Sequence, residues 1–287
     1  MKEAISNIIA QAEKAAEAHP DCRGTEIDGI VHCDSCGKPR QAIINFLGRP
    51  RKQWIMCDCM IDKQLNDEQQ MKMRLQKEKI ERLRVTGMAK FEQMNHTFEN
   101  DNGKQAENMK LCREYVNKFD EVYKQGTTLL FYGPNGTGKS YAANSIANAL
   151  IDKGIPVLTT SFGIIANQLM AAPYEERLSY YADLNQYPLI VIDDLGAERN
   201  TEFMEEIIFR VFTDRENSGK PMICSTNLSV EFFKDPPDDA WKRICSRLLK
   251  KCFPVKFDGE DQRKKSFVEH YKTMKDILKP RDEAQSL

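Results

Sequence analysis

Residues 127–140 read Thr-Thr-Leu-Leu-Phe-Tyr-Gly-Pro-Asn-Gly-Thr-Gly-Lys-Ser, an apolar run followed by a glycine-rich loop. From Gly133 onward the loop has the spacing G-x-x-x-x-G-K-[ST], in which backbone N–H groups surround a phosphate. The apolar stretch Tyr141–Asp152 follows at once, so we expect a strand, a loop and a helix in that order. The N-terminus of that helix would add its dipole to the phosphate site. These flanks disfavour the alternative, a glycine-rich turn with a solvated lysine.

The loop residues have separate expected roles. Lys139 should reach the β- and γ-phosphates, and Ser140 should hold Mg²⁺ through its hydroxyl. The sequence therefore predicts ATP and Mg²⁺ as cofactors. The expected nucleotide-binding residues are Gly133, Pro134, Asn135, Gly136, Thr137, Gly138, Lys139, Ser140 and Tyr141.

Two further apolar runs end in polar side chains. Leu189-Ile-Val-Ile-Asp193-Asp194 ends in paired carboxylates, which are costly at the end of a buried strand without a cation or a donor nearby. We expect Asp193 to bind Mg²⁺, directly or through water, and Asp194 to orient and deprotonate the attacking water. Asn227, after the run Pro221–Thr226, should position that water near the γ-phosphate. A helix N-cap for the aspartates and a turn cap for the asparagine are the non-catalytic alternatives.

Helical pieces alternate with short apolar runs from about residue 95 to 257. Near-continuous apolar strands are typical of a parallel sheet covered on both faces, so the predicted fold class is α/β with a phosphate-loop core. A long solvated helix is expected from Ile61 to Val85, ending at Gly87. The expected strands are Thr127–Tyr132, Pro156–Phe162, Leu189–Asp193, Pro221–Thr226 and Cys252–Phe257.

Four of the nine cysteines lie within 27 positions near the N-terminus. Their spacing approximates a zinc ribbon with four thiolates, which would be structural because no ligand position stays open. The second pair is separated by one residue rather than the usual two, so Cys22 and His32 are substitutes for the fourth ligand, and metal-free thiols or a redox switch are alternatives. The other cysteines from position 112 onward are expected to be small core residues. The predicted zinc ligands are Cys33, Cys36, Cys57 and Cys59.

These patterns divide the chain of 287 residues into three parts. We expect residues 1–60 to form an amphipathic helix and a small zinc-binding module, 61–94 a helical linker, and 95–287 the ATPase domain with a basic C-terminal lid segment. The small N-terminal part lacks the bulk for its own core and needs a staple. With no secretory signal and no apolar run long enough to span a bilayer, we expect a soluble, cytoplasmic protein without a membrane partner.

Charge is unevenly distributed although the net charge is only −1. Residues 93–240 carry 13 basic and 22 acidic side chains, whereas residues 241–287 carry 13 and 7. Contact with nucleic acid is therefore expected to be local, and the basic C-terminal piece could add phosphate affinity.

The motifs together resemble the AAA+ ATPases of the DnaC/DnaI/IstB group, most closely the helicase loaders of Gram-positive bacteria and their phages. The resemblance covers roughly residues 95–265, and the phosphate loop is one of the motifs that carry it. Residues 22–60 also resemble the Cys-rich N-terminal module of those loaders. The motifs are Ile192-Asp-Asp-Leu-Gly-Ala-Glu198-Arg199, Ser225-Thr-Asn227-Leu and Arg243-Ile-Cys-Ser-Arg247-Leu.

This resemblance implies specific roles. Asn227 corresponds to the sensor 1 residue, and Arg247 to the arginine finger that reaches a neighbouring subunit's ATP site. Arg263 corresponds to the sensor 2 arginine, which contacts the γ-phosphate from the lid, although the family more often has Ser-Tyr before it. The alternative for these arginines is a solvated helix face.

The resemblance also implies partners and an activity. The expected protein is an ATPase that self-associates on ATP binding and loads the replicative hexameric DNA helicase onto single-stranded DNA. Residues 171–187, with Tyr174, Arg177, Tyr180 and Tyr181, lie where this clade places a helix near DNA, although packing explains tyrosines equally well.

Two other functions remain open. A transposition-regulating ATPase of the same group works on duplex DNA, but it usually lacks the Cys-rich module. A nucleotide-regulated adaptor with little turnover is also compatible with the sequence, because Asp194 is shorter than the usual glutamate.

Overall fold

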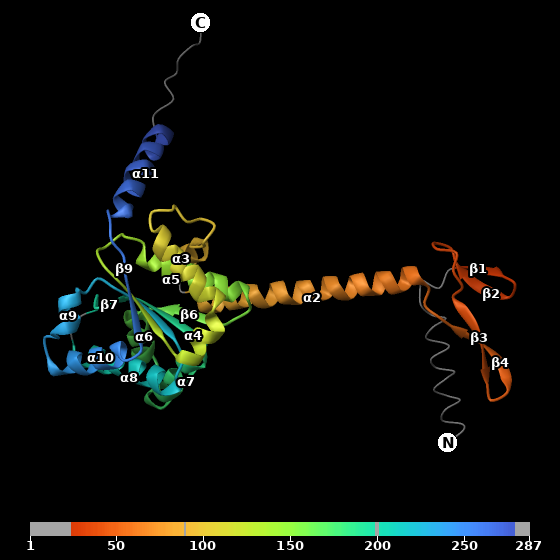
Figure 1. Ribbon diagram of the computed structural model, residues 1–287, viewed down its shortest axis with the longest axis horizontal. Coiled ribbons are helices and arrows are strands. Elements are labelled where there is room, and N and C mark those ends of the chain that lie inside the picture. The colour runs from red at the N-terminus through yellow and green to blue at the C-terminus, as the bar shows by residue number, and fades with distance from the viewer. Residues whose placement is uncertain (1–23, 89, 199–200, 279–287) are drawn as a thin grey trace, which may run out of the picture. The chain divides into compact units, whose positions relative to one another are not determined.

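The computed structural model describes residues 24–88, 90–198 and 201–278 (Figure 1). Contacts divide the chain into two units, with the boundary between Lys77 and Glu78. The expected amphipathic helix in the first twenty residues, and the alternative zinc ligand Cys22, lie outside the described residues.

The described part of the first unit contains two antiparallel hairpins and the beginning of a long helix. β1 (Gly24–Ile27) pairs with β2 (Ile30–Cys33), and β3 (Gln41–Phe46) pairs with β4 (Arg49–Trp54). Each turn has two residues, and the second is a glycine with a positive φ, 76° at Gly29 and 78° at Gly48. The described part of these hairpins buries little apolar surface, which agrees with a unit that needs a cross-link or a bound metal for its stability.

The long helix α2 (Asp58–Gly87) confirms the expected helix and its end. Most of it is exposed, but Ile80 and Leu83 near its C-terminal end pack on the core of the second unit. A Cβ at Gly87 would lie 2.1 Å from the carbonyl oxygen of Val157, so only glycine allows this close approach. Within the described residues, no helix is long and apolar enough to cross a membrane.

All five predicted strands of the second unit are present and pair in parallel, in the order β6-β7-β8-β5-β9, which confirms the α/β class. The sheet therefore gathers the carboxyl ends of its strands at one edge, where α/β proteins bind ligands. The strands are β5 (Thr128–Tyr132), β6 (Val157–Thr160), β7 (Leu189–Leu195), β8 (Met222–Thr226) and β9 (Cys252–Lys256).

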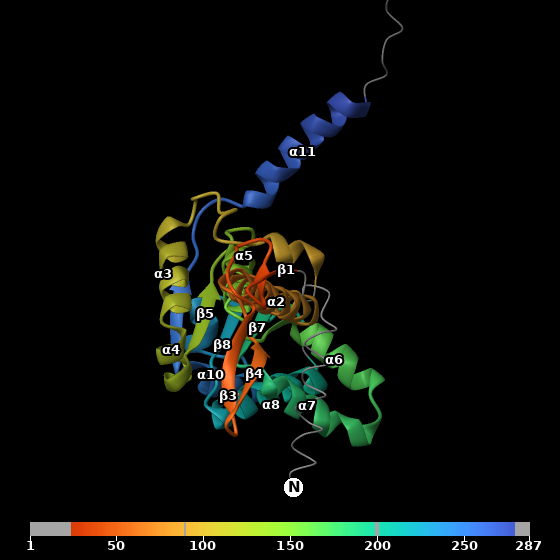
Figure 2. The same cartoon turned by 90° about the vertical axis from the view of Figure 1, so that its right-hand side faces the viewer.

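Helices cover both faces of this sheet (Figures 1 and 2). Alternate strand residues divide between two cores: Leu129 and Phe131 face one, and Leu130 faces the other. The first core contains α3 (Ala106–Asn117), α4 (Phe119–Gln125) and α5 (Lys139–Asp152). The second contains α6 (Phe162–Ala171), α7 (Arg177–Gln186), α8 (Glu202–Ser218) and α10 (Asp239–Leu249).

Shorter pieces complete the second unit. The 3-10 helix η1 (Phe91–Asn95) follows α2, and η2 (Tyr174–Glu176) precedes α7. α9 (Val230–Lys234) follows β8, and α11 (Gln262–Leu278) is the last described helix.

Candidate nucleotide-binding site

The glycine-rich loop joins the end of β5 to the start of α5. Gly133, Gly136 and Gly138 have φ values of 139°, 72° and 102°, in the region that side chains rarely adopt. A Cβ at Gly133 would lie 2.0 Å from the Phe257 carbonyl oxygen, and one at Gly136 would lie 1.7 Å from Asp261 Oδ1. No side chain caps α5, whose N-cap is Gly138. Uncapped N–H groups beside a glycine-lined cradle fit a bound phosphate.

Lys139 connects this loop to the end of β8. Its ammonium donates hydrogen bonds to the carbonyl oxygens of Gly133 and Pro134, at 2.8 and 2.7 Å, and to Asn227 Oδ1 at 2.7 Å. Burial lowers the pKa of Lys139, and the nearby Asp194 and Asp193 oppose that shift. The structure thus brings Lys139 and Asn227 together, although 88 positions separate them.

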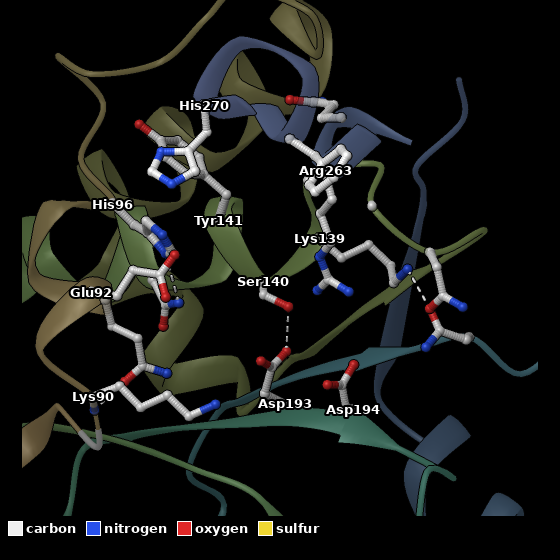
Figure 3. Close-up of a pocket in the computed structure, with 18 residues that line it drawn as sticks. Lys90, Glu92, His96, Lys139, Ser140, Tyr141, Asp193, Asp194, Arg263 and His270 are labelled. Atoms are coloured by element: carbon white, nitrogen blue, oxygen red, sulfur yellow. Dashed lines mark hydrogen bonds between the residues drawn. The ribbon is translucent and has the colours of Figure 1, made fainter. Parts of the chain in front are cut away.

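The paired aspartates lie opposite Ser140 at the end of β7. Ser140 Oγ donates to Asp193 Oδ1 at 2.7 Å (Figure 3). The buried Ser225 hydroxyl donates to the same oxygen. A serine hydroxyl beside a carboxylate is a set of hard oxygen donors that suits Mg²⁺. The sequence motif around Asn227 includes Ser225 but assigns no role to it. Its position one residue before the end of a buried strand could have indicated a contact with the aspartates.

Asp194 is held in an uncommon backbone conformation. Its φ is 58°, and its backbone N–H donates to Ser225 Oγ at 3.0 Å. Burial raises the pKa of Asp194, and the negative charge of Asp193 adds to the effect. A carboxylate with a raised pKa accepts a proton more readily than an ordinary one.

These groups line a cavity of about 620 Å³, a size that suits a nucleotide. One wall comes from η1 and the first turns of α5, including His96, Tyr141 and Asn144. The opposite wall comes from α11, from which Arg263 and His270 point into the cavity (Figure 3). Lys139, Ser140, Asp193, Asp194, Asn227 and Arg263 all line it, as do Asn135, Gly136, Gly138 and Tyr141.

The wall formed by η1 was missed by sequence reasoning. The His96 ring lies 4.8 Å from that of Tyr141, between ring centroids, and burial lowers the pKa of His96. Tyr141 also donates to the Thr97 carbonyl oxygen at 2.7 Å. No sequence motif links η1 and His96 to α5. The spacing of Tyr141 and Asn144, one helical turn apart, indicates only that these two side chains lie on the same face of α5.

Arg247 does not line the nucleotide cavity of its own chain. It is in the last turn of α10, where it donates to Glu216 Oε2 at 3.1 Å and lies 6.0 Å from the ring centroid of Phe209. It lines a small pocket with Thr128 and Met222, at the starts of β5 and β8, whereas the nucleotide cavity lies at the strand ends. The chain therefore does not bring Arg247 to its own cavity.

The four predicted zinc ligands come together in the first unit. Their Sγ atoms all lie within 4.8 Å of one another, and Cys33 Sγ lies 3.5 Å from Cys59 Sγ. Backbone N–H donors of Cys36 and Ser35 lower the pKa of Cys33 to about 6, which favours the thiolate that a metal needs. His32 is outside this group and has Nδ1 3.0 Å from the Ile30 carbonyl oxygen. Four clustered thiols fit a tetrahedral zinc site.

The remaining described cysteines belong to the second unit. Cys112, Cys224 and Cys245 are buried, and Cys252 is partly buried. Burial raises the pKa of each, to about 12 for Cys112 and about 11 for Cys245. These thiols confirm the expectation of small core residues.

The tyrosines of residues 171–187 separate into two kinds. Tyr180 and Tyr181 pack against the second core, as the packing alternative predicts, and Tyr187 does so too. Tyr174 is 80% exposed, with the Arg177 guanidinium 6.0 Å from its ring centroid. Of the four tyrosines, Tyr174 is the one available for stacking.

Comparison with known proteins agrees with this geometry. The family model of IstB-like ATP binding proteins matches residues 51–269. The chain is 28% identical over 152 residues to a Sinorhizobium fredii protein described as an insertion sequence ATP-binding protein, covering 52% of this chain and 51% of that protein. It is 30% identical over 125 residues to the replicative helicase loader DnaC of Escherichia coli K12, covering 42% of this chain and 49% of DnaC. The chain thus spans about half the length of the curated relatives it matches.

A solved structure has the same fold. The crystal structure of DnaI aligns with a TM-score of 0.50 and 19% identity, covering 63% of this chain and 100% of that one. The predicted AAA+ core of the DnaC/DnaI/IstB type is therefore confirmed as a fold.

Proposed function

Because the chain belongs to the family of IstB-like ATP binding proteins, we propose that it is an ATP-dependent loader of the replicative hexameric DNA helicase. It would place the helicase on single-stranded DNA, with ATP hydrolysis coupled to assembly and release. One observation carries the proposal: a single chain combines a glycine-lined nucleotide cavity with a separate unit that holds four clustered thiols. DnaC, which is named a replicative helicase loader, is 30% identical to this chain over 125 residues.

The chain's own residues divide the work of hydrolysis. The N–H groups of the loop and the Lys139 ammonium would hold the phosphates, while Ser140 and Asp193 would hold the metal. Bound Mg²⁺ would neutralise charge that develops on the phosphates. Asn227 orients the attacking water, and Asp194, with its raised pKa, accepts the proton. Arg263 enters from α11, opposite the η1 wall, and adds positive charge at the γ-phosphate.

Arg247 serves a neighbouring subunit in this scheme. It is 41% exposed and lies away from its own chain's cavity, so a second copy is needed to use it as a finger. A planar cation supplied in trans stabilises the transferring phosphoryl group and makes turnover depend on assembly. ATP binding would thereby favour self-association.

The N-terminal part supplies the helicase contact. Cys33, Cys36, Cys57 and Cys59 would hold a structural zinc that staples the two hairpins. Residues 1–60 then act as the docking module, residues 61–94 as the linker, and residues 95–287 as the ATPase. Single-stranded DNA would contact the exposed Tyr174 and the basic segment after residue 240.

A transposition-regulating ATPase is the second candidate. The similarity to an insertion sequence ATP-binding protein favours it, since that relative matches over more residues than DnaC does. The thiol cluster argues for the loader, because the transposition proteins that the sequence resembles usually lack a Cys-rich N-terminal module. A nucleotide-regulated adaptor is the third candidate, and slow turnover with tight ATP binding would support it.

Co-purification with the host's replicative helicase, with and without ATP, tests the proposal. We expect a complex with the helicase and ATP-dependent loading onto a circular single strand, measured as unwinding of an annealed oligonucleotide. Lys139→Ala should abolish loading but leave the docking module folded. Failure of the wild-type chain to bind the helicase in either condition, together with binding to a transposase, would favour the transposition function instead.

A further inference from the structure

Lys90 is a cation of the nucleotide cavity to which no motif assigns a role. It lies in the loop between α2 and η1, in the linker rather than in the sheet core. It lines both the nucleotide cavity and an adjoining pocket of about 300 Å³, and Asp193 and Asp194 line both as well. Figure 3 shows its side chain pointing from the linker toward Asp193. The lysine is exposed, so its ammonium can move onto a ligand.

The backbone around Lys90 is attached to the strand next to the aspartates. The N–H group of Lys90 donates to Gln93 Oε1 at 3.0 Å. Thr159 Oγ1, on β6, lies 3.2 Å from the same oxygen and 3.1 Å from the Gly87 carbonyl oxygen. These contacts hold the backbone on both sides of Lys90, so its side chain enters the cavity from a defined backbone position.

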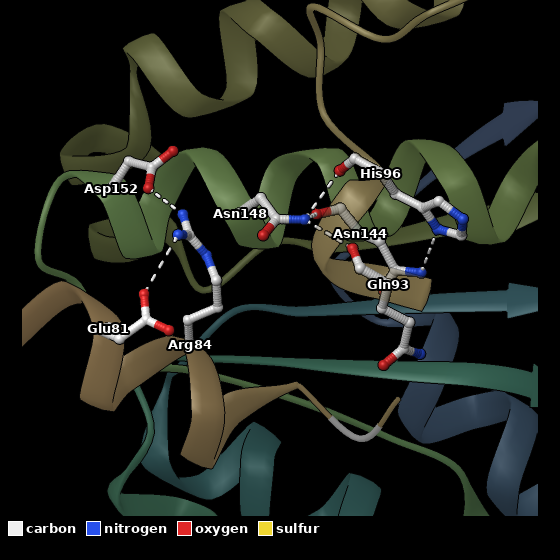
Figure 4. Close-up of polar contacts among 7 residues, drawn as sticks. All are labelled: Glu81, Arg84, Gln93, His96, Asn144, Asn148 and Asp152. Carbon is white, nitrogen blue, oxygen red and sulfur yellow. Dashed lines mark hydrogen bonds and ion pairs between the residues drawn. The ribbon is translucent and has the colours of Figure 1, made fainter. Parts of the chain in front are cut away.

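The same loop is attached to the helix that follows the phosphate loop. Asn148, on α5, is 99% buried and donates to the carbonyl oxygens of Gln93 and His96, at 2.9 Å each (Figure 4). Arg84, near the end of α2, donates to Asp152 at the other end of α5. The end of α2, the loop and α5 are therefore held together, and Lys90 keeps its place relative to Lys139.

Charge decides which end of a nucleotide Lys90 can meet. Two carboxylates, Asp193 and Asp194, lie near it, and the field of Lys90 reaches Asp194. In a phosphate-loop site the aspartate end is where the metal and the terminal phosphate lie. Glu92 and Glu198 also line the pockets around Lys90, and among the described side chains Arg263 and Lys139 are further cations of the cavity. A lysine ammonium binds phosphate as a point charge without a fixed geometry.

We propose that Lys90 contacts the terminal phosphate of bound ATP and thereby makes the linker loop distinguish ATP from ADP. The inference rests on the proposed nucleotide site and adds to it a phosphate-contacting residue in the linker. With a triphosphate bound, the loop and the end of α2 are tied to the phosphates as well as to α5. With a diphosphate bound, the γ-phosphate is missing, so Lys90 loses its contact with the nucleotide. The number of contacts that hold the linker loop therefore depends on whether ATP or ADP occupies the cavity.

Paired affinities test the role of Lys90. In Lys90→Gln, we expect the affinity for a non-hydrolysable ATP analogue with Mg²⁺ to fall about tenfold, the loss of one charged hydrogen bond, while that for ADP changes less than about twofold. Lys90→Arg should restore most of the discrimination, and Lys104→Gln, an exposed lysine of the same unit, should behave as wild type. An unchanged ratio of the two affinities, or an equal loss for both nucleotides, would overturn the inference.

Hydrogen exchange of residues 88–97 in the wild-type chain gives a test without any substitution. We expect stronger protection with the ATP analogue than with ADP, and equal protection would count against the role of Lys90. Lys139→Ala separates this inference from the proposed site. If Lys139→Ala loses both nucleotides but Lys90→Gln keeps the wild-type ratio, only the inference about Lys90 fails; if Lys139→Ala binds normally, the site itself fails.

Discussion

Replacing Lys139 by alanine removes a side chain that connects the glycine-rich loop to Asn227. In the structure its ammonium has three oxygen acceptors, all between 2.7 and 2.8 Å. When a nucleotide is bound, we expect the same ammonium to contact phosphate oxygens. Charged hydrogen bonds contribute about 1.5–3 kcal/mol each, so losing it should weaken ATP binding by about a hundredfold.

The fold should tolerate this change. Burial lowers the pKa of Lys139, which means that the folded state already opposes its charge. Of the acceptors left behind, the side-chain amide of Asn227 lines an open cavity and can be hydrated. We therefore expect the free energy of unfolding to change by less than about 1 kcal/mol.

Calorimetric titration with a non-hydrolysable ATP analogue and Mg²⁺ measures the affinity, and denaturant unfolding measures the stability. Lys104→Ala, an exposed lysine in the same unit, is the matched control and should match wild type in both. If the alanine variant does not fold, Lys139→Met retains the apolar stem and repeats the test. An affinity within about threefold of wild type in a folded variant would refute the phosphate-loop reasoning.

Three further outcomes follow from the site. Metal analysis should find about one zinc per chain, and Cys33→Ser should lose it whereas Cys112→Ser keeps it; a metal-free wild-type chain with folded hairpins would contradict the staple. Arg247→Ala should bind ATP normally but lose assembly-dependent turnover, whereas Arg243→Ala on the same helix should retain it; equal turnover in both variants would rule out the finger. Because burial raises the pKa of Asp194, turnover should fall on acidification at a pH above the usual aspartate value of 3.8, and a pH–rate profile without that shift would argue against a general base there.

Local signals were sufficient where the chemistry is local. The five strands are short apolar runs bounded by polar residues, so their positions followed from hydrophobicity alone. The phosphate loop was recognisable because positive φ values demand glycine at fixed offsets, as Gly136 and Gly138 demonstrate. The four thiols were found from their spacing despite the short gap between Cys57 and Cys59.

The parts of the site that were missed depend on contacts between distant segments. Lys90 and His96 enter the cavity because α2 and η1 pack against β6 and α5, and no spacing rule encodes that packing. Ser225 contacts Asp193 across neighbouring strands, which requires the order of the sheet as well as the strands themselves. Sequence patterns also gave no sign that Arg247 is held by Glu216 at the far ends of the strands.

A crystal structure of the chain with Mg²⁺ and a non-hydrolysable ATP analogue tests the central claim most directly. The account predicts a triphosphate along residues 133–140, with the metal between Ser140 and Asp193 and the γ-phosphate facing Asp194 and Asn227. A nucleotide bound elsewhere, or an empty cradle at saturating analogue, would contradict it.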